Sequence, residues 1–186
     1  SSTDVTVKWD GAPAVFAGID PLDGEFFVAK KGIFNKDPKV YKSHADIDAD
    51  TGGDLSTKLK YAFDELKDLG ITDVIQGDIM FTKGDVGSET IDGEKMITFQ
   101  PNTIVYAIPA KSDLAKTVLK ANLGVVWHTT YKGADFASMK ASFGVNLKGL
   151  KKKSSVWYQD ATLKDLSGTA TLTKLDTEEV TQSLSK

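Results

Sequence analysis

The chain has 186 residues, of which 40% are hydrophobic and 26% are charged, so it has enough apolar material for the core of one domain. It contains no cysteine, which excludes disulfides, thiolate metal sites and a cysteine nucleophile. Its 23 basic residues are all lysine and its net charge is −3, which excludes a uniformly basic nucleic-acid coat.

The charge is divided unevenly along the chain. Residues 1–93 hold 10 lysines against 18 acidic residues, and residues 94–186 hold 13 lysines against 8. The second half includes a cluster at Lys148, Lys151, Lys152 and Lys153. This cluster either contacts phosphate or forms a solvated loop, and a solvated loop is the simpler interpretation. Because no apolar run approaches the roughly 18 residues that span a bilayer, we expect a cytoplasmic protein without a membrane partner.

The first predicted element is a strand that begins at Val5. Val5, Val7 and Trp9 alternate with polar residues, and this period of two places Lys8 and Asp10 together on the other face. Because the first residue is not a methionine and a strand begins so soon after it, we expect the chain to be a piece of a longer protein.

The following segments predict a hairpin, a loop and a helix. Residues 14–31 contain two apolar runs around a turn-rich centre, which predicts a β-hairpin. Residues 35–53 are polar and without periodicity, which predicts an exposed loop. Apolar residues spaced by three and four predict a helix over residues 55–69, with Asp54 as its N-cap and Gly70 as its end.

The rest of the chain predicts short strands mixed with separate helices. We expect a strand over residues 73–81, a hairpin over 89–99, a strand over 103–108, a helix over 113–120 capped by Ser112, a strand over 123–131, a helix over 134–142, an edge strand over 156–158 and a helix start within 177–185. Hairpins mixed with separate helices predict an α+β fold of mostly antiparallel sheets with flanking helices, in a single domain.

The sharpest local feature is Lys8-Trp9-Asp10-Gly11, a lysine at a strand end followed by an acid and a glycine that allows a tight turn. A lysine becomes a nucleophile when its surroundings keep part of it unprotonated, whereas an ordinary lysine with a pKa near 10.4 is inert at neutral pH. The alternative is a surface lysine that leads into a β-turn.

These four residues resemble motif I, K-x-D-G, of the covalent nucleotidyltransferases, which include ATP-dependent DNA ligases, RNA ligases and mRNA capping enzymes. The stretches KWDGAPAVFAG, GEFFVAKKGIFNK, QGDIMFTKGD and GVVWHTTYKG are similar to an uncharacterised group of bacteriophage proteins that we associate with this superfamily. The resemblance implies an adenylation-domain architecture, ATP-grasp-like, over residues 1–186. It also implies ATP and Mg²⁺ as cofactors, RNA or DNA ends as acceptors, and the infected host cell as the location.

The resemblance assigns roles to the first two motifs. It implies that Lys8 attacks the α-phosphate to form a lysyl-AMP, with Asp10 and Gly11 completing the nucleotide-binding motif. Lys30 and Lys31, on the next hairpin, would supply the basic residue that contacts ribose or phosphate, with Lys31 in place of the usual arginine. GTP is the alternative to ATP.

Further candidates lie in the middle of the chain. Gly77 and Asp78 resemble motif III, whose acid helps to hold ribose or metal, so Asp78 is the candidate metal ligand. Tyr106 lies in a stretch that resembles motif IIIa, whose aromatic residue stacks on the base. Trp127 is a second candidate for base stacking, or else packs on a sheet, and His128 either binds phosphate or base or is a satisfied strand histidine.

Two departures from the family pattern affect the expected activity. Leu123 stands where motif IV needs an acid, and Lys151 and Lys153 match motif V, K-x-K, only as part of a lysine run. Either those motifs lie beyond Lys186, or the chain is not a working ligase. Two alternatives therefore remain: a catalytically incomplete nucleotide- or nucleic-acid-binding phage protein, and a structural or interaction protein of a phage.

Overall fold

The computed structural model describes residues 5–165, 171–175 and 180–185, with side chains for residues 8–162. Its helices are η1 (Lys31–Phe34), α1 (His44–Asp50), α2 (Gly53–Leu66), η2 (Lys83–Asp85), α3 (Asp113–Lys120), η3 (Phe136–Ser138) and η4 (Leu147–Gly149). Its strands are β1 (Val5–Lys8), β2 (Ala14–Ile19), β3 (Phe26–Ala29), β4 (Val74–Thr82), β5 (Gly87–Ile91), β6 (Glu94–Phe99), β7 (Ile104–Pro109), β8 (Leu123–Lys132), β9 (Lys140–Phe143), β10 (Val156–Asp160), β11 (Thr162–Asp165), β12 (Thr171–Leu175) and β13 (Val180–Ser185).

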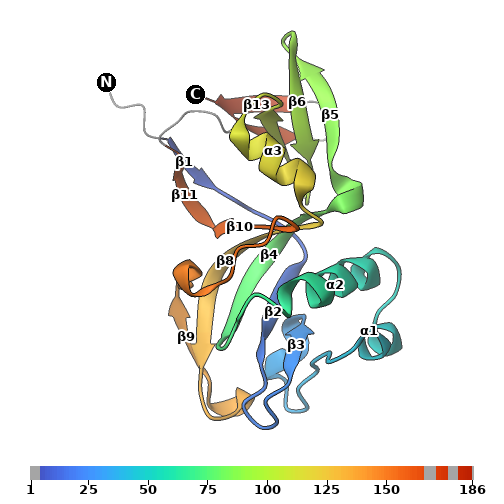
Figure 1. The fold of residues 1–186 in the computed structure, drawn as a ribbon, viewed down its shortest axis with the longest axis vertical. Coiled ribbons are helices and arrows are strands. Elements are labelled where there is room, and N and C mark those ends of the chain that lie inside the picture. Colours follow the sequence, from blue (N-terminus) through green and yellow to red (C-terminus); the bar gives the residue numbers. More distant parts are fainter. Residues whose placement is uncertain (1–4, 166–170, 176–179, 186) are drawn as a thin grey trace.

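The strands form two main sheets and a short ribbon (Figure 1). The six-stranded sheet has the order β10-β8-β4-β2-β3, with β9 paired to β8, and the five-stranded sheet has the order β13-β12-β7-β6-β5. β1 pairs with β11 in the ribbon. The described pairs are antiparallel except β10 with β8, which is parallel, so the expected α+β class with mostly antiparallel sheets is confirmed.

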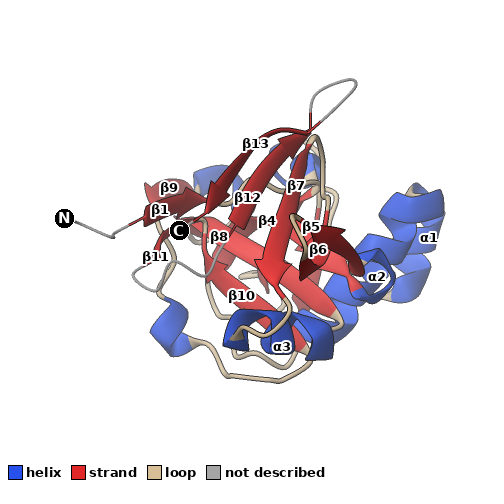
Figure 2. Ribbon diagram, turned by 90° about the horizontal axis from the view of Figure 1, so that it is seen from above, coloured by secondary structure: helices blue, strands red, loops and turns tan. Residues whose placement is uncertain are grey.

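Helices cover only part of each sheet. α1 and α2 lie against one face of the six-stranded sheet, and α3 lies beside the five-stranded sheet (Figure 1). Viewed from above, the strands of the five-stranded sheet cross over those of the six-stranded sheet (Figure 2). The face of the six-stranded sheet that points away from α2 is thus left without a covering α-helix in the part of the chain that the structure describes.

Three cores hold these layers together, and the third lies where Ile33 of η1 and Phe136 of η3 pack on Phe16 of β2. Under α2, the helix residues Leu59 and Leu66 pack against Ile75, Ile79 and Trp127 of the sheet. Between the sheets lies a second core with a large aromatic content, made chiefly of Trp9, Met80, Phe81, Phe99, Tyr106 and Trp157. Since both sheets contribute to this second core, its burial is what joins them.

Close approach of strands depends on two glycines in the centre of the six-stranded sheet. A Cβ added to Gly77 would overlap the carbonyl oxygen of Val126, and one added to Gly124 would overlap the ring of Phe81. Each glycine therefore lets a neighbouring strand or ring occupy the space that a side chain would fill.

Most elements predicted from the sequence are confirmed. β2 and β3 form the hairpin expected over residues 14–31, and β5 and β6 form the one expected over 89–99. α2 and α3 lie where helices were predicted, and Ser112 caps α3 by accepting a hydrogen bond from the backbone of Ala115. The predicted ends of the first helix were wrong, because α2 begins at Gly53 after the N-cap Gly52, not after Asp54, and ends at Leu66. β10 lies at an edge of its sheet, as predicted.

The prediction of an exposed loop over residues 35–53 was wrong in its second part. Ser43 caps α1 by accepting a hydrogen bond from the Asp46 amide, and Ile47 is the only residue of α1 that is fully buried. One apolar residue in a seven-residue helix produces no periodicity, so the capping residues were the available signal.

Two other helix predictions were also wrong. Residues 134–142 form the short turn η3 and then β9, because the exposed backbone of β8 beyond β10 takes up an additional antiparallel strand. In the tail, residues 180–185 form β13, and residues 176–179 lie outside the described part of the chain. Within the described residues, no helix combines the length and the apolar character needed to cross a bilayer.

We expect Gly77→Ala to destabilise the fold by about 2–3 kcal/mol, because the new methyl group overpacks the β4–β8 contact. Urea unfolding followed by circular dichroism would measure the loss. Gly84→Ala is the matched control, because no atom lies within 4 Å of its added Cβ. Equal stability of the two variants would contradict the role assigned to Gly77.

Candidate functional site

The Lys8-Trp9-Asp10-Gly11 segment passes from the β1–β11 ribbon to the six-stranded sheet. The Trp9 amide donates to the carbonyl of Ala161 at 2.8 Å, which holds the segment to the ribbon side. Three residues later, the Ala12 amide donates to the carbonyl of Ile79 at 3.0 Å, and the Ile79 amide donates back to Pro13 at 2.9 Å. The segment is thus fixed at both ends by backbone hydrogen bonds.

Tyr106 of β7 holds the middle of this segment from the other sheet. Its hydroxyl oxygen accepts from the Asp10 amide at 2.6 Å, and the hydroxyl donates to the Asp10 carbonyl at 3.2 Å. Asn102 donates to the same carbonyl at 3.3 Å. Burial raises the pKa of Tyr106 to about 12, so the hydroxyl keeps the proton that it donates.

Asp78 of β4 lies directly against the segment. Its side chain packs against Gly11, and its Oδ2 lies 4.0 Å from Nε2 of His128 on β8. Burial raises the pKa of Asp78; His128 lowers it, and the nearby charge of Asp10 raises it further. A Cβ at Gly11 would meet the backbone of Ile79 and the side chain of Asp78, so glycine permits this close approach.

His128 lies on the Asp78 face by ordinary alternation, because Trp127 before it points into the core under α2. Its Nδ1 lies 2.7 Å from Oγ1 of Thr129. A bulge follows, since Gly77 pairs with Trp127 but Gln76 pairs with Thr129. The bulge interrupts the alternation, so Thr129 shares the Asp78 face with His128 instead of pointing toward α2.

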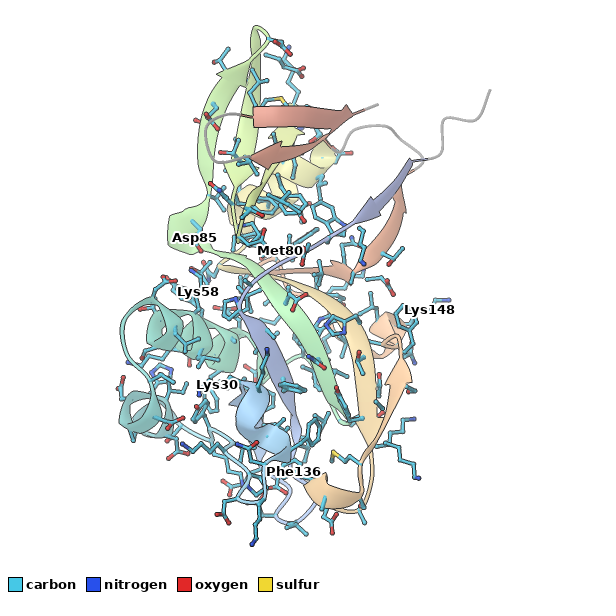
Figure 3. The ribbon with its side chains drawn as sticks, turned by 180° about the vertical axis from the view of Figure 1, so that it is seen from behind. Lys30, Lys58, Met80, Asp85, Phe136 and Lys148 are labelled. Atoms are coloured by element: carbon cyan, nitrogen blue, oxygen red, sulfur yellow. The ribbon has the colours of Figure 1, made fainter. Side chains whose placement is uncertain are left out.

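The same sheet face continues away from the segment toward η1 and η3, on the side that Figure 3 shows from behind. Next to Asp78 on this face, Gln76 accepts a hydrogen bond from the hydroxyl of Tyr131 at 2.6 Å. The ring of Tyr131 lies 4.8 Å from that of Phe34, which is 41% exposed. Sequence reasoning missed Phe34, whereas Gln76 lies in the stretch that resembles motif III and on the Asp78 face of β4.

Lys8 itself is exposed at the end of β1. It shares a strand face with Asp10, because Trp9 between them points into the core. Lys8 forms no ion pair with any side chain that the structure describes. A cavity of about 500 Å³ beside β9 contains none of the predicted site residues.

Two other lysines predicted for the site are directed elsewhere. Nζ of Lys30 lies 3.8 Å from Oδ2 of Asp50 in α1, where Lys39 also pairs with that carboxylate at 3.0 Å. Lys31 is exposed in η1. Neither makes a contact that links it to Asp78, so the structure does not bring the second predicted motif to the first.

Base stacking by Tyr106 or Trp127 does not agree with the structure. Both side chains are 0% exposed. Tyr106 packs between Trp9 and Phe99, with ring centroids 5.0 and 5.4 Å away, and Trp127 belongs to the core under α2. Tyr106 is therefore a positioning residue for the Asp10 peptide, and Trp127 is a core residue.

The acidic residues of the site could bind a metal ion only together with a ligand that also coordinates the ion. Among the residues that the structure describes, no group of three or more histidine and acidic side chains could hold a metal on its own. Mg²⁺ usually keeps several waters and takes one or two carboxylates together with substrate phosphates. Asp78 and Asp10 fit that role, because the charge of Asp10 is close enough to raise the pKa of Asp78.

Comparison with known proteins identifies the family of the chain. Residues 1–186 match the model of a family described as Family of unknown function (DUF6267). The chain belongs to this family. None of the curated proteins and none of the solved structures compared with the chain matches it. The family description gives no function, so the function is inferred from the geometry of the site.

We expect Tyr106→Phe to destabilise this DUF6267 chain by about 1–2 kcal/mol, because the amide and carbonyl of Asp10 lose their shared partner. Hydrogen exchange at the Asp10 amide would become faster. Tyr61→Phe is the control, because Tyr61 is a partly buried tyrosine in the core under α2. Unchanged stability together with unchanged exchange would show that the hydroxyl does not hold the segment.

We expect Asp78→Asn to stabilise the fold near pH 7. Burial raises the pKa of Asp78 above 3.8, so the ionised carboxylate destabilises the folded state at neutral pH, and this cost is lost as the pH falls through the raised pKa. The gain from the amide should therefore disappear below about pH 3.8. The urea midpoints of the two proteins, measured from pH 3 to pH 8, test this prediction. Asp37→Asn is the control, because Asp37 is exposed. An Asp78→Asn midpoint no higher than that of the unsubstituted chain at pH 7 would contradict the prediction.

Proposed function

We propose that this chain is a nucleotide-binding domain of the covalent nucleotidyltransferase type, with Lys8 as the nucleophile toward ATP. The observation that carries the proposal is the close packing of Gly11 on Asp78, where a Cβ on Gly11 would come within 2.9 Å of the Cβ of Asp78. It joins the segment that resembles motif I to the glycine and acid that resemble motif III, although the two lie far apart in the sequence. The pair of Asp78 and His128, whose Oδ2 and Nε2 lie 4.0 Å apart, supports the same assignment.

The chemistry needs an amine that is free to attack. An amine held in a salt bridge is kept protonated, and Lys8 has no such partner among the described side chains. In the proposed step, Nζ forms a bond to the α-phosphorus as the bond from that phosphorus to the bridging oxygen breaks. The electron pair leaves with pyrophosphate, and the amine loses a proton to a nearby base or water.

The remaining residues of the site would position the nucleotide. Tyr106 fixes the peptide that follows Lys8, which limits how far the lysine can move from the Asp78 side of the site. His128, beside Asp78, can donate a hydrogen bond from a ring N–H to a phosphate oxygen. Asp78 and Asp10 would hold Mg²⁺ together with the phosphates, and the ion would neutralise charge on pyrophosphate as it leaves.

A second candidate function is nucleotide binding without transfer. Leu123 occupies the position where the family pattern needs an acid, and it is fully buried at the start of β8. Exposure of Lys8 also favours this candidate, because a desolvated pocket is the usual way to activate a lysine. Calorimetry with ATP distinguishes the two, because the binding module should take up nucleotide without releasing pyrophosphate.

The test is covalent labelling of the chain with α-labelled ATP and Mg²⁺, followed by a denaturing gel. We expect an acid-labile labelled band that is lost in Lys8→Ala and kept in Lys36→Ala, which removes another exposed lysine. A parallel reaction with GTP identifies the base. The absence of a band from the intact chain with both nucleotides would reject transfer, and the absence of calorimetric binding as well would reject the nucleotide site.

A further inference from the structure

A lysine-rich surface lies on α3 and on the segment of residues 147–153, away from the residues assigned to nucleotide transfer. On α3, Lys116 and Lys120 are exposed one turn apart, and on the segment Lys148, Lys151 and Lys152 are exposed. We call these five residues the lysine surface. None of them forms an ion pair with a side chain that the structure describes. The five charges are therefore available to an anionic partner.

The segment of residues 147–153 is held in place by contacts along its length. The hydroxyl of Tyr158 donates to the carbonyls of Leu150 and Lys151 at 3.3 and 3.2 Å. The amide of Lys151 donates to the carbonyl of Leu69 at 2.9 Å. These contacts order the backbone that carries the lysines, so the stretch is a loop with solvent-exposed lysines, as the simpler interpretation predicted, and its backbone is fixed.

α3 and the segment of residues 147–153 meet at a cavity of about 240 Å³, and Lys152 is the member of the lysine surface that lines it. Leu114 and Thr117 of α3 line one side, and Lys152 and Lys153 line the other. The floor is formed by β10 from Val156 to Gln159. Figure 1 shows the chain that leads into β10 passing beside α3, and Figure 3 labels Lys148 at the outer end of the segment.

The acidic residues next to the lysine surface do not neutralise most of its positive charge. Glu65 of α2 pairs with Lys153, with Oε1 3.7 Å from Nζ, so Lys153 is excluded from the lysine surface. On the exposed strip of α3 that carries Lys116 and Lys120, the only acid is Asp113, at the first position. The net charge of the whole chain is −3, so this positive region is local and would orient a polyanion toward one face.

Among polyanions, the features of this surface favour nucleic acid over a lipid surface. Membrane-surface segments combine lysine with a broad apolar face that enters the bilayer, whereas the large apolar side chain exposed on α3 is Leu119 alone. Lysine ammonium groups are point charges that suit successive backbone phosphates. The cavity adds the polar side chains of Thr117 and Gln159 beside them.

We propose that the lysine surface is a binding site for the phosphate backbone of a nucleic acid. This goes beyond nucleotidyl transfer, because transfer to Lys8 needs only a mononucleotide. If about four phosphates are neutralised, the logarithm of the association constant should fall with the logarithm of salt concentration with a slope of about −3.5 for duplex DNA and about −3 for single strands.

Fluorescence anisotropy with labelled 20-nucleotide strands tests the proposal. The arms are single-stranded DNA, single-stranded RNA and duplex DNA, each titrated with the full chain from low to moderate salt. For the variant Lys120→Gln/Lys152→Gln we expect at least about tenfold weaker binding at low salt than for the unsubstituted chain. We also expect the slope of the logarithm of the association constant against the logarithm of salt concentration to be less steep by about two. The matched control is Lys36→Gln/Lys140→Gln, which makes the same charge change at exposed lysines outside this surface.

Each outcome decides the proposal. Salt-dependent binding of at least one nucleic acid that is lost in the surface variant and kept in the control supports it. Equal loss in both variants shows a diffuse charge effect and overturns the site. No binding of any strand at low salt also overturns it. The titration uses neither ATP nor labelling of Lys8, so its result does not depend on the outcome of the labelling experiment.

Discussion

Tyr106, buried between the two sheets, fixes the Lys8-Trp9-Asp10-Gly11 segment on which the candidate site depends. Tyr106 belongs to the five-stranded sheet, yet its hydroxyl holds both polar groups of the Asp10 peptide. The aromatic core around it, with Trp9 and Phe99 at 5.0 and 5.4 Å, keeps that hydroxyl in position. Any ligand bound near Asp78 therefore meets a backbone that is already ordered, which lowers the entropic cost of binding.

The polar residues on the sheet face away from α2 form a continuous set because of two local irregularities. A bulge in β8 brings Thr129 and Tyr131 to the same face as Asp78 and His128, and Gly11 has no side chain that would keep the segment away from β4. The side chains of Asp78 and His128 are 21% and 28% exposed, so this region is partly removed from water. A site with a half-buried acid, an imidazole and a nearby unpaired lysine is suited to bind phosphate, which is the common element of the proposals made above.

The two charged regions of the chain have different origins. The acidic side chains of the first half are largely engaged in ion pairs near α1 and α2, as with Asp50 and Lys39 or Asp48 and Lys60. Among the described side chains, the lysines on α3 and residues 147–153 lack such partners, except for Lys153, which pairs with Glu65. The uneven charge in the sequence thus becomes an uneven surface, with a positive region that is held by Tyr158.

The sequence by itself determined the local elements and the residue types of the site. Alternation predicted β1, β2 and β4, spacing of apolar residues predicted α2, and the K-W-D-G motif indicated Lys8, Asp10 and Gly11. Only the tertiary structure decided which candidates meet. It joined Gly11 to Asp78, directed Lys30 to Asp50, and buried Tyr106 and Trp127, because such contacts depend on strand order and bulges that local patterns do not encode.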